Sequence, residues 1–359
     1  MRSIARHTCK QLRRRFRTSG HNDFTPGPMI LSGRTVWKCV LASGAITVLS
    51  AVSALAMDKV TLRTEVFFHG PHAPFFLGVE KGFYKDDGIE LTVNAGTGSG
   101  TVIKLVGNRN DDFGYADGGT LVKAVSEGVP VKMVMGILQA SPMAIVSLRE
   151  SGIAKPRDLP GKTMAGTPGS STELMFPAFC KINKIDCSGI SIVQVDIPSK
   201  VSALLAKRVQ GTFVYTVTQV PMIEDQIGGP LNVIHYSDYG LNMLSNGIVV
   251  NSEVIDKNPD LVRRFVRATV KSWQYAIDHQ DEAVAAFGKV SDKPKASVVR
   301  QQLNTTLSLL TTSRTKGKPL GWMSPDDWRE SVAYLEEYGG IPKSISPDRI
   351  FTNAFVDAK

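Results

Sequence analysis

The run Phe68–Val93 constrains the fold more than any other part of this sequence. Its pattern predicts a strand, a loop that carries two histidines, a helix, a glycine turn and a second strand. Short β-rich runs alternate with amphipathic helices along the rest of the chain, and Gly247–Val250 predicts a strand that returns to the first sheet. We therefore expect an α/β protein with mainly parallel sheets flanked by helices. Its two lobes would be residues 57–140 plus 243–359 and residues 141–242, with a ligand cleft between them.

Periodicity and cap residues predict individual elements. Alternation predicts a strand over Lys59–Phe67, and helical spacing predicts helices over Phe75–Asp86 and Ser171–Ile182. Asn258 and Ser324 each precede a Pro-Asp pair, which is a pattern typical of a helix N-cap followed by the first helical turn.

Residues 1–56 resemble a secretory leader. Arg34 and Lys38 form a basic flank, an apolar run follows, and Ala54–Ala56 fits a small-x-small cleavage pattern. We expect cleavage near Ala56, a periplasmic mature protein, and a natural start at Met29. A retained membrane anchor is the alternative, because the apolar run is almost long enough to span a bilayer.

The basic charge of the chain lies in this leader. The formal net charge is +9, but residues 1–56 hold nine Lys/Arg and one acidic residue, which leaves a net charge of +1 for residues 57–359. A basic surface that binds nucleic acid is therefore not indicated.

Two cysteines, Cys180 and Cys187, lie beyond the leader and bracket the end of a predicted helix. An oxidising compartment would allow them to form a disulfide, whereas a buried helix cysteine and an unpaired loop cysteine fit the sequence equally well. No histidine accompanies them at metal-ligand spacing, so we expect no metal site.

Three loops share the order strand, Gly/Ser/Thr/Asp loop, helix N-terminus: Gly96–Thr101, Asp117–Thr120 and Gly166–Thr172. Glycine lets backbone N–H groups approach a ligand, and a helix start supplies free donors. The candidate ligand-binding residues of these loops are Gly98, Ser99, Asp117, Gly118, Thr167, Gly169, Ser170, Ser171 and Thr172. Structural alternatives remain: a tight turn for the first loop, a helix cap at Asp117, and a capping box that begins at Ser170.

Further candidates lie at strand ends and between the two sets of elements. His69 and His72 flank Gly70-Pro71 in the first loop, and a neutral imidazole offers one donor and one acceptor. The alternative for both histidines is a hydrogen bond to nearby backbone. The remaining candidates are Phe68, Ser141, Tyr215, Thr216 and Asn246.

Several stretches resemble the NMT1/THI5-like (SsuA/THI5-like) solute-binding proteins of ABC transporters. They include HAPFFLGVEKGFYKDDGIELTV, DFGYADGGTLVKAV, LPGKTMAGTPGSS and PDLVRRFVRATVKSW, and the resemblance covers Val60 to about Tyr338. It implies a type 2 periplasmic-binding fold that closes on its ligand. It also singles out His72, Asp117 and Ser170–Thr172 as contacts.

The resemblance implies a binding protein, without a cofactor, that delivers a small solute to an ABC permease and its ATPase. We expect a monomer whose ligand is a heterocyclic or aromatic/organic-acid solute, similar to a pyrimidine or thiamine precursor or to a sulfonate. The absence of arginine from the candidate loops favours a neutral or weakly charged ring. The alternative is an exported enzyme or sensory domain of the same fold, such as a pyrimidine-synthase relative, although the cysteine-rich iron motif of the yeast-type synthases is absent from the sequence.

Overall fold

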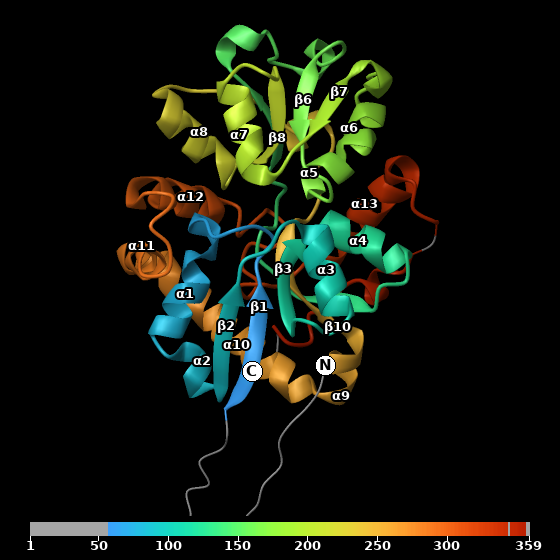
Figure 1. The fold of residues 1–359 in the computed structure, drawn as a ribbon. Helices are drawn as coiled ribbons and strands as arrows, with labels where there is room; N and C mark the ends of the chain where they lie inside the picture. Colours follow the sequence, from blue (N-terminus) through green and yellow to red (C-terminus); the bar gives the residue numbers. More distant parts are fainter. Residues whose placement is uncertain (1–56, 344, 357–359) are drawn as a thin grey trace, which may run out of the picture. The chain divides into compact units, whose positions relative to one another are not determined.

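The computed structural model describes residues 57–343 and 345–356, which form two α/β lobes (Figure 1). The leader predicted for residues 1–56, with its cleavage site and its start at Met29, lies outside the described residues. Each lobe is built on one five-stranded sheet.

The first lobe contains a sheet with the strand order β2-β1-β3-β10-β4. Its strands are β1 (Asp58–Arg63), β2 (Ile89–Asn94), β3 (Phe113–Asp117), β4 (Val131–Gly136) and β10 (Asn246–Asn251). β1 is parallel to β2 and β3, whereas β10 is antiparallel to β3 and β4. The return of the chain to the first sheet, which the sequence predicts, is therefore confirmed.

The second lobe repeats this plan with the strand order β7-β6-β8-β5-β9. Its strands are β5 (Met143–Ser147), β6 (Thr163–Gly166), β7 (Ser191–Gln194), β8 (Gly211–Tyr215) and β9 (Asn232–His235). β6 is parallel to β7 and β8, and β5 is antiparallel to β8 and β9. In each sheet the antiparallel strand is the first one that the chain forms after it crosses from the other lobe.

Helices flank both sheets (Figure 1). Those of the first lobe are α1 (Ala73–Glu80), α2 (Phe83–Asp86), α3 (Ser99–Gly107), α4 (Gly118–Ser126), α9 (Ser252–Lys257), α10 (Pro259–Asp278), α11 (Gln280–Gly288), α12 (Ala296–Ser308) and α13 (Pro325–Tyr334). Those of the second lobe are α5 (Ser171–Leu174), α6 (Phe176–Ile182), α7 (Ile197–Leu205) and α8 (Gln219–Ile227). Short helical turns are η1 (Gly70–His72), η2 (Arg149–Ser151), η3 (Pro156–Asp158), η4 (Cys187–Gly189), η5 (Ser237–Tyr239), η6 (Leu335–Gly339) and η7 (Pro347–Arg349).

Two connections join the lobes, one between β4 and β5 and the other between β9 and β10. They are hydrogen-bonded to each other, since Ser245 N–H donates to the Leu138 carbonyl and Leu138 N–H donates to the Asn246 carbonyl, at 3.0 and 2.8 Å. The Ser141 N–H also donates to Asn242 Oδ1 at 3.4 Å. These paired segments have the position expected of a hinge.

Helix α10 begins where its cap residue predicts. Asn258 Oδ1 accepts a hydrogen bond from the Leu261 N–H, and the face that carries Phe265, Thr269 and Trp273 is fully buried. The Phe265 ring stacks on Phe113 of β3 with centroids 3.8 Å apart. The Ser324 cap is also confirmed, because its hydroxyl accepts from the Asp327 N–H at the start of α13.

Three predicted elements differ from the structure. The first strand ends at Arg63 instead of Phe67, because Thr64 N–H makes the last ladder bond to Asn94 and the chain then turns into the cleft. The helix predicted over Phe75–Asp86 is interrupted near Gly82, whose φ of 76° lies in the left-handed region that glycine tolerates. The helix predicted over Ser171–Ile182 divides into α5 and α6 because Pro177 has no N–H for the helical ladder.

Cys180 and Cys187 form a disulfide at the end of α6, with their Cα atoms 6.1 Å apart. Within residues 57–343 and 345–356 no helix is long and apolar enough to cross a membrane. The same residues contain no group of three or more His, Cys, Asp or Glu side chains that could hold a metal ion.

Candidate functional site

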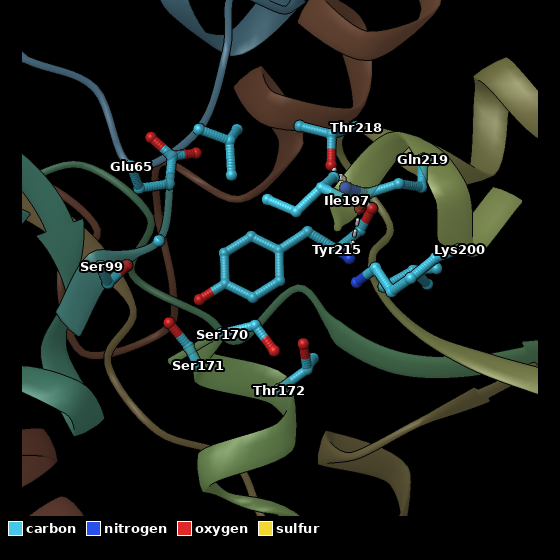
Figure 2. Close-up of a pocket in the computed structure, with 13 residues that line it drawn as sticks. Glu65, Ser99, Ser170, Ser171, Thr172, Ile197, Lys200, Tyr215, Thr218 and Gln219 are labelled. Atoms are coloured by element: carbon cyan, nitrogen blue, oxygen red, sulfur yellow. Dashed lines mark hydrogen bonds between the residues drawn. The ribbon is translucent and has the colours of Figure 1, made fainter. Parts of the chain in front are cut away.

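A narrow pocket lies between the lobes, and we refer to it as the central pocket (Figure 2). The first lobe contributes the segment after β1 and the start of α3. The second lobe contributes the start of α5, the end of β8 and parts of α7 and α8. The lining residues are Glu65, Val66, Gly98, Ser99, Ser170, Ser171, Thr172, Ile197, Lys200, Val214, Tyr215, Thr218 and Gln219.

The lobes contact each other beside this pocket. A Cβ atom added to Gly98 would lie 3.1 Å from the Gly169 carbonyl oxygen, so the two glycine loops touch across the cleft. The side chain of Gln302 in α12 adds a buried link. Its oxygen accepts from the Gly70 N–H, and its amide donates to the Thr218 carbonyl of the second lobe. The structure therefore has the two lobes closed on the pocket.

The Glu65 carboxylate is the negative charge of the central pocket. Only 4% of the residue is exposed, and Oε2 lies 3.0 Å from His72 Nε2. His72 is fully buried, and its Nδ1 accepts a hydrogen bond from the His69 backbone N–H at 3.0 Å. The proton therefore lies on Nε2, and the imidazole donates it to Glu65. Among the described residues His72 alone bonds this carboxylate, so one oxygen remains available to a ligand.

Lys200 carries a positive charge into the opposite wall. The residue is 3% exposed, and Nζ donates to the Phe213 carbonyl at 2.8 Å. Burial lowers the pKa of Lys200 to about 8, and the Glu173 carboxylate opposes this shift. One hydrogen bond uses one of the three ammonium donors, so this amine can also donate to a ligand.

Two buried hydroxyl groups of the second lobe, Ser170 Oγ and the Tyr215 hydroxyl, make no close hydrogen bond to any of the described residues, although Ser171, Ser245 and Asp117 lie near the Tyr215 hydroxyl. Figure 2 shows the Tyr215 hydroxyl directed toward Ser99 and Ser171. Burial raises the pKa of Tyr215 well above its usual value, and the Asp117 charge adds to this shift. Buried polar groups without partners are rare in proteins, so both hydroxyls are suited to bind a ligand.

Six predicted site residues lie together in the central pocket: Gly98, Ser99, Ser170, Ser171, Thr172 and Tyr215. Ser170 occupies the N-cap position of α5, but its hydroxyl makes no cap hydrogen bond. The capping-box alternative is therefore wrong for this side chain, which instead faces the cleft.

The other predicted residues do not line the central pocket. Thr167 and His69 line neighbouring openings of the cleft, while Ser141 and Thr216 line a cavity on the hinge side. The remaining residues, which lie outside all of these pockets, are Phe68, His72, Asp117, Gly118, Gly169 and Asn246.

Asp117 and Phe68 have structural partners of their own. Asp117 Oδ1 accepts from the N–H and the hydroxyl of Thr120 and caps α4, while Oδ2 accepts from the Ser245 hydroxyl. Burial raises the pKa of Asp117, and these hydrogen bonds oppose the shift. The Phe68 ring packs edge-on against Phe76 at 4.8 Å.

Sequence reasoning missed Glu65, Lys200 and Thr218, and with them the apolar lining residues Val66, Ile197 and Val214. The alternating pattern predicts a strand through Phe67, in which Glu65 would be an ordinary strand residue. The strand instead ends at Arg63, so Glu65 lies in the segment that follows it. Lys200 had a usable signal. It follows Ile197 by three residues and precedes Leu204 by four, so it lies on the apolar face of α7.

A family model described as NMT1/THI5 like matches residues 70–283, which confirms the resemblance seen in the sequence. The riboflavin-binding protein RibY of Chloroflexus aurantiacus is 25% identical over 306 residues, covering 84% of this chain and 86% of the relative. The formylaminopyrimidine-binding protein of Halalkalibacterium halodurans is 18% identical over 303 residues, covering 83% and 91%.

Other comparisons concern an enzyme and a solved structure. The 4-amino-5-hydroxymethyl-2-methylpyrimidine phosphate synthase of Legionella pneumophila is 23% identical over 310 residues, covering 85% of this chain and 94% of the relative. The crystal structure of the periplasmic aliphatic sulphonate binding protein SsuA from Escherichia coli has a TM-score of 0.62 at 12% identity, covering 84% of this chain and 94% of that one. Because only 12% of the residues are identical, this similarity concerns the fold alone, and it confirms the predicted two-lobed α/β fold.

Proposed function

The chain belongs to the NMT1/THI5 like family, and on this basis we propose that it is an exported solute-binding protein that delivers a small heterocycle to an ABC permease. The leader pattern and the Cys180–Cys187 disulfide both support export, because disulfides persist in oxidising compartments. The names of the binding relatives and the fold of SsuA support the transport role.

One observation carries this proposal: the central pocket is closed by both lobes and contains buried polar groups that make no close hydrogen bond to any described residue. Among the described residues, the Ser170 and Tyr215 hydroxyls make no close hydrogen bond, and the buried Glu65 carboxylate bonds only His72. A ligand that bridges the lobes would complete these hydrogen bonds only in the closed form. It would therefore shift the open–closed equilibrium toward closure.

The charges of the central pocket favour a ring with N–H donors. Glu65 accepts hydrogen bonds from a ligand amine or ring N–H, and it repels a sulfonate or carboxylate. Lys200 and Ser170 can donate to a ring nitrogen or carbonyl on the other side. An amino-substituted heterocycle offers both types of group in one plane. We therefore favour pyrimidine-like or flavin-like rings over aliphatic sulfonates.

A pyrimidine-forming enzyme is the second candidate, because several relatives carry that name. The two functions differ in what becomes of the ligand. A binding protein returns its ligand unchanged, whereas a synthase that uses its own side chains would alter its own mass.

Thermal unfolding and calorimetry with four probes would test the proposal: 4-amino-5-hydroxymethyl-2-methylpyrimidine, riboflavin, methanesulfonate and benzoate. We expect at least one heterocycle to raise the melting temperature and to bind with a stoichiometry near one. Mass spectrometry after release should show ligand and protein unchanged. Binding of the two anions alone would reject the heterocycle, and an altered protein mass would favour the enzyme.

A further inference from the structure

Two open pockets of about 540 and 580 Å³ lie beside the central pocket. Ile197 lines both the central pocket and the first outer pocket, while Phe67 and Pro198 line both outer pockets. We call the two outer pockets together the outer groove. The shared lining residues place the outer groove next to the central pocket.

His69 is an unexplained polar residue in the wall of the outer groove. It is 1% exposed, and neither Nδ1 nor Nε2 has a hydrogen-bond partner within residues 57–343 and 345–356. Its backbone is fixed on both sides, because its N–H donates to His72 Nδ1 and its carbonyl accepts from the His72 N–H. Burial, with a smaller effect of His72, lowers the pKa of His69 to about 3. The ring is therefore neutral at neutral pH and offers one donor and one acceptor.

The groove around His69 is lined from both lobes by apolar side chains and by charged ones, among them Asp292 and Lys293. The centroid of the Phe67 ring lies 4.7 Å from that of the imidazole, and Val201 of α7 and Met222 of α8 line the same pocket. Lys295 of the first lobe and Asp225 of the second form an ion pair at 2.7 Å in the wall of the same pocket. Each of these charges therefore already has a partner.

We propose that the outer groove is a second subsite that holds a hydroxyl-bearing extension of the solute, hydrogen-bonded to His69. A hydroxyl group is both donor and acceptor, so it matches a neutral imidazole, and the carbon chain that carries it matches Phe67 and Met222. This inference rests on the proposed function, because it requires that the central pocket hold a ring.

The test compares two pairs of probes that differ in their extension. Riboflavin carries a hydroxylated chain that lumiflavin lacks, and thiamine carries a hydroxyethyl-bearing second ring that 4-amino-5-hydroxymethyl-2-methylpyrimidine lacks. Calorimetry with the purified protein should show the longer member of at least one pair binding about tenfold tighter or more. In His69→Ala this preference should fall to about threefold or less, while the affinity for the shorter member stays within about twofold.

Two further variants make the result specific. His69→Asn retains a donor and an acceptor, so it should restore part of the preference and guards against a folding defect in the alanine variant. His279→Ala removes an exposed histidine that stacks on Tyr275, and it should leave all affinities unchanged.

Equal affinities within both pairs, or an equal loss for both members in His69→Ala, would overturn the second subsite and leave the proposed function intact. Failure of all four probes to bind would instead reject the heterocyclic ligand, and the subsite with it.

Discussion

The charge of Glu65 should decide how tightly this protein holds its solute. Glu65→Gln removes the charge and keeps nearly the same shape, and the amide oxygen can still accept the His72 Nε2–H. A hydrogen bond to a charged group contributes about 1.5–3 kcal/mol and a neutral one about 0.5–1.5 kcal/mol. We therefore expect a loss of about 1–2 kcal/mol, or about 5- to 30-fold weaker binding of a heterocycle with N–H donors.

His72 should act through the same carboxylate. His72→Ala leaves Glu65 without its single described hydrogen-bond partner and should weaken binding by about tenfold or more. Since both residues belong to one chain of hydrogen bonds, the double variant should lose less than the two single losses added together. Calorimetry on the four proteins gives this coupling directly.

A matched control is Glu90→Gln, which removes an exposed carboxylate from β2 in the same lobe. It should leave the dissociation constant unchanged. If Glu65→Gln also bound the heterocycle within about twofold of the unaltered protein, the role assigned to Glu65 would be refuted.

Three more perturbations have defined outcomes. Below pH 8 the Lys200 amine is charged in both the folded and the unfolded protein. Between pH 8 and 10.5 it is protonated mainly in the unfolded chain, so the free energy of unfolding should rise by about 3 kcal/mol across that range. Denaturant titrations should show a smaller rise in Lys200→Met. Replacing Cys180 and Cys187 by serine should lower the free energy of unfolding by about 2 kcal/mol, because the disulfide closes a short loop; an unchanged denaturation midpoint would contradict this. Gln302→Ala removes the link to Thr218 and should raise the ligand dissociation rate several-fold with little change in the association rate, as measured by stopped-flow fluorescence.

The fold follows from local sequence patterns to a large extent. Helices α10 and α13 start at their predicted caps, Asn258 and Ser324, because a cap depends on residues close together in the chain. The predicted bounds are wrong where tertiary contacts or backbone geometry determine the end of a helix or strand. Strand β1 stops at Arg63, whose guanidinium is fixed by Asp111.

The residues of the central pocket likewise fall into those that local sequence predicts and those that it does not. Loops before helix starts are visible in sequence, so Ser99, Ser170 and Thr172 are predicted and lie together. Glu65 and Lys200 are not predicted, because their place in the central pocket depends on how two distant segments meet. The cleft-facing aromatic residue beside the histidines is Phe67 and not its neighbour Phe68, a difference set by where β1 ends.

One solute should bind between the lobes and be released unaltered. A crystal structure of the protein with the tightest-binding heterocycle tests it most directly. We predict density for an intact ring bounded by Glu65, Ser170 and Tyr215, with both lobes in contact with it. A ring bound elsewhere on the protein, or one covalently joined to a side chain, would contradict the claim.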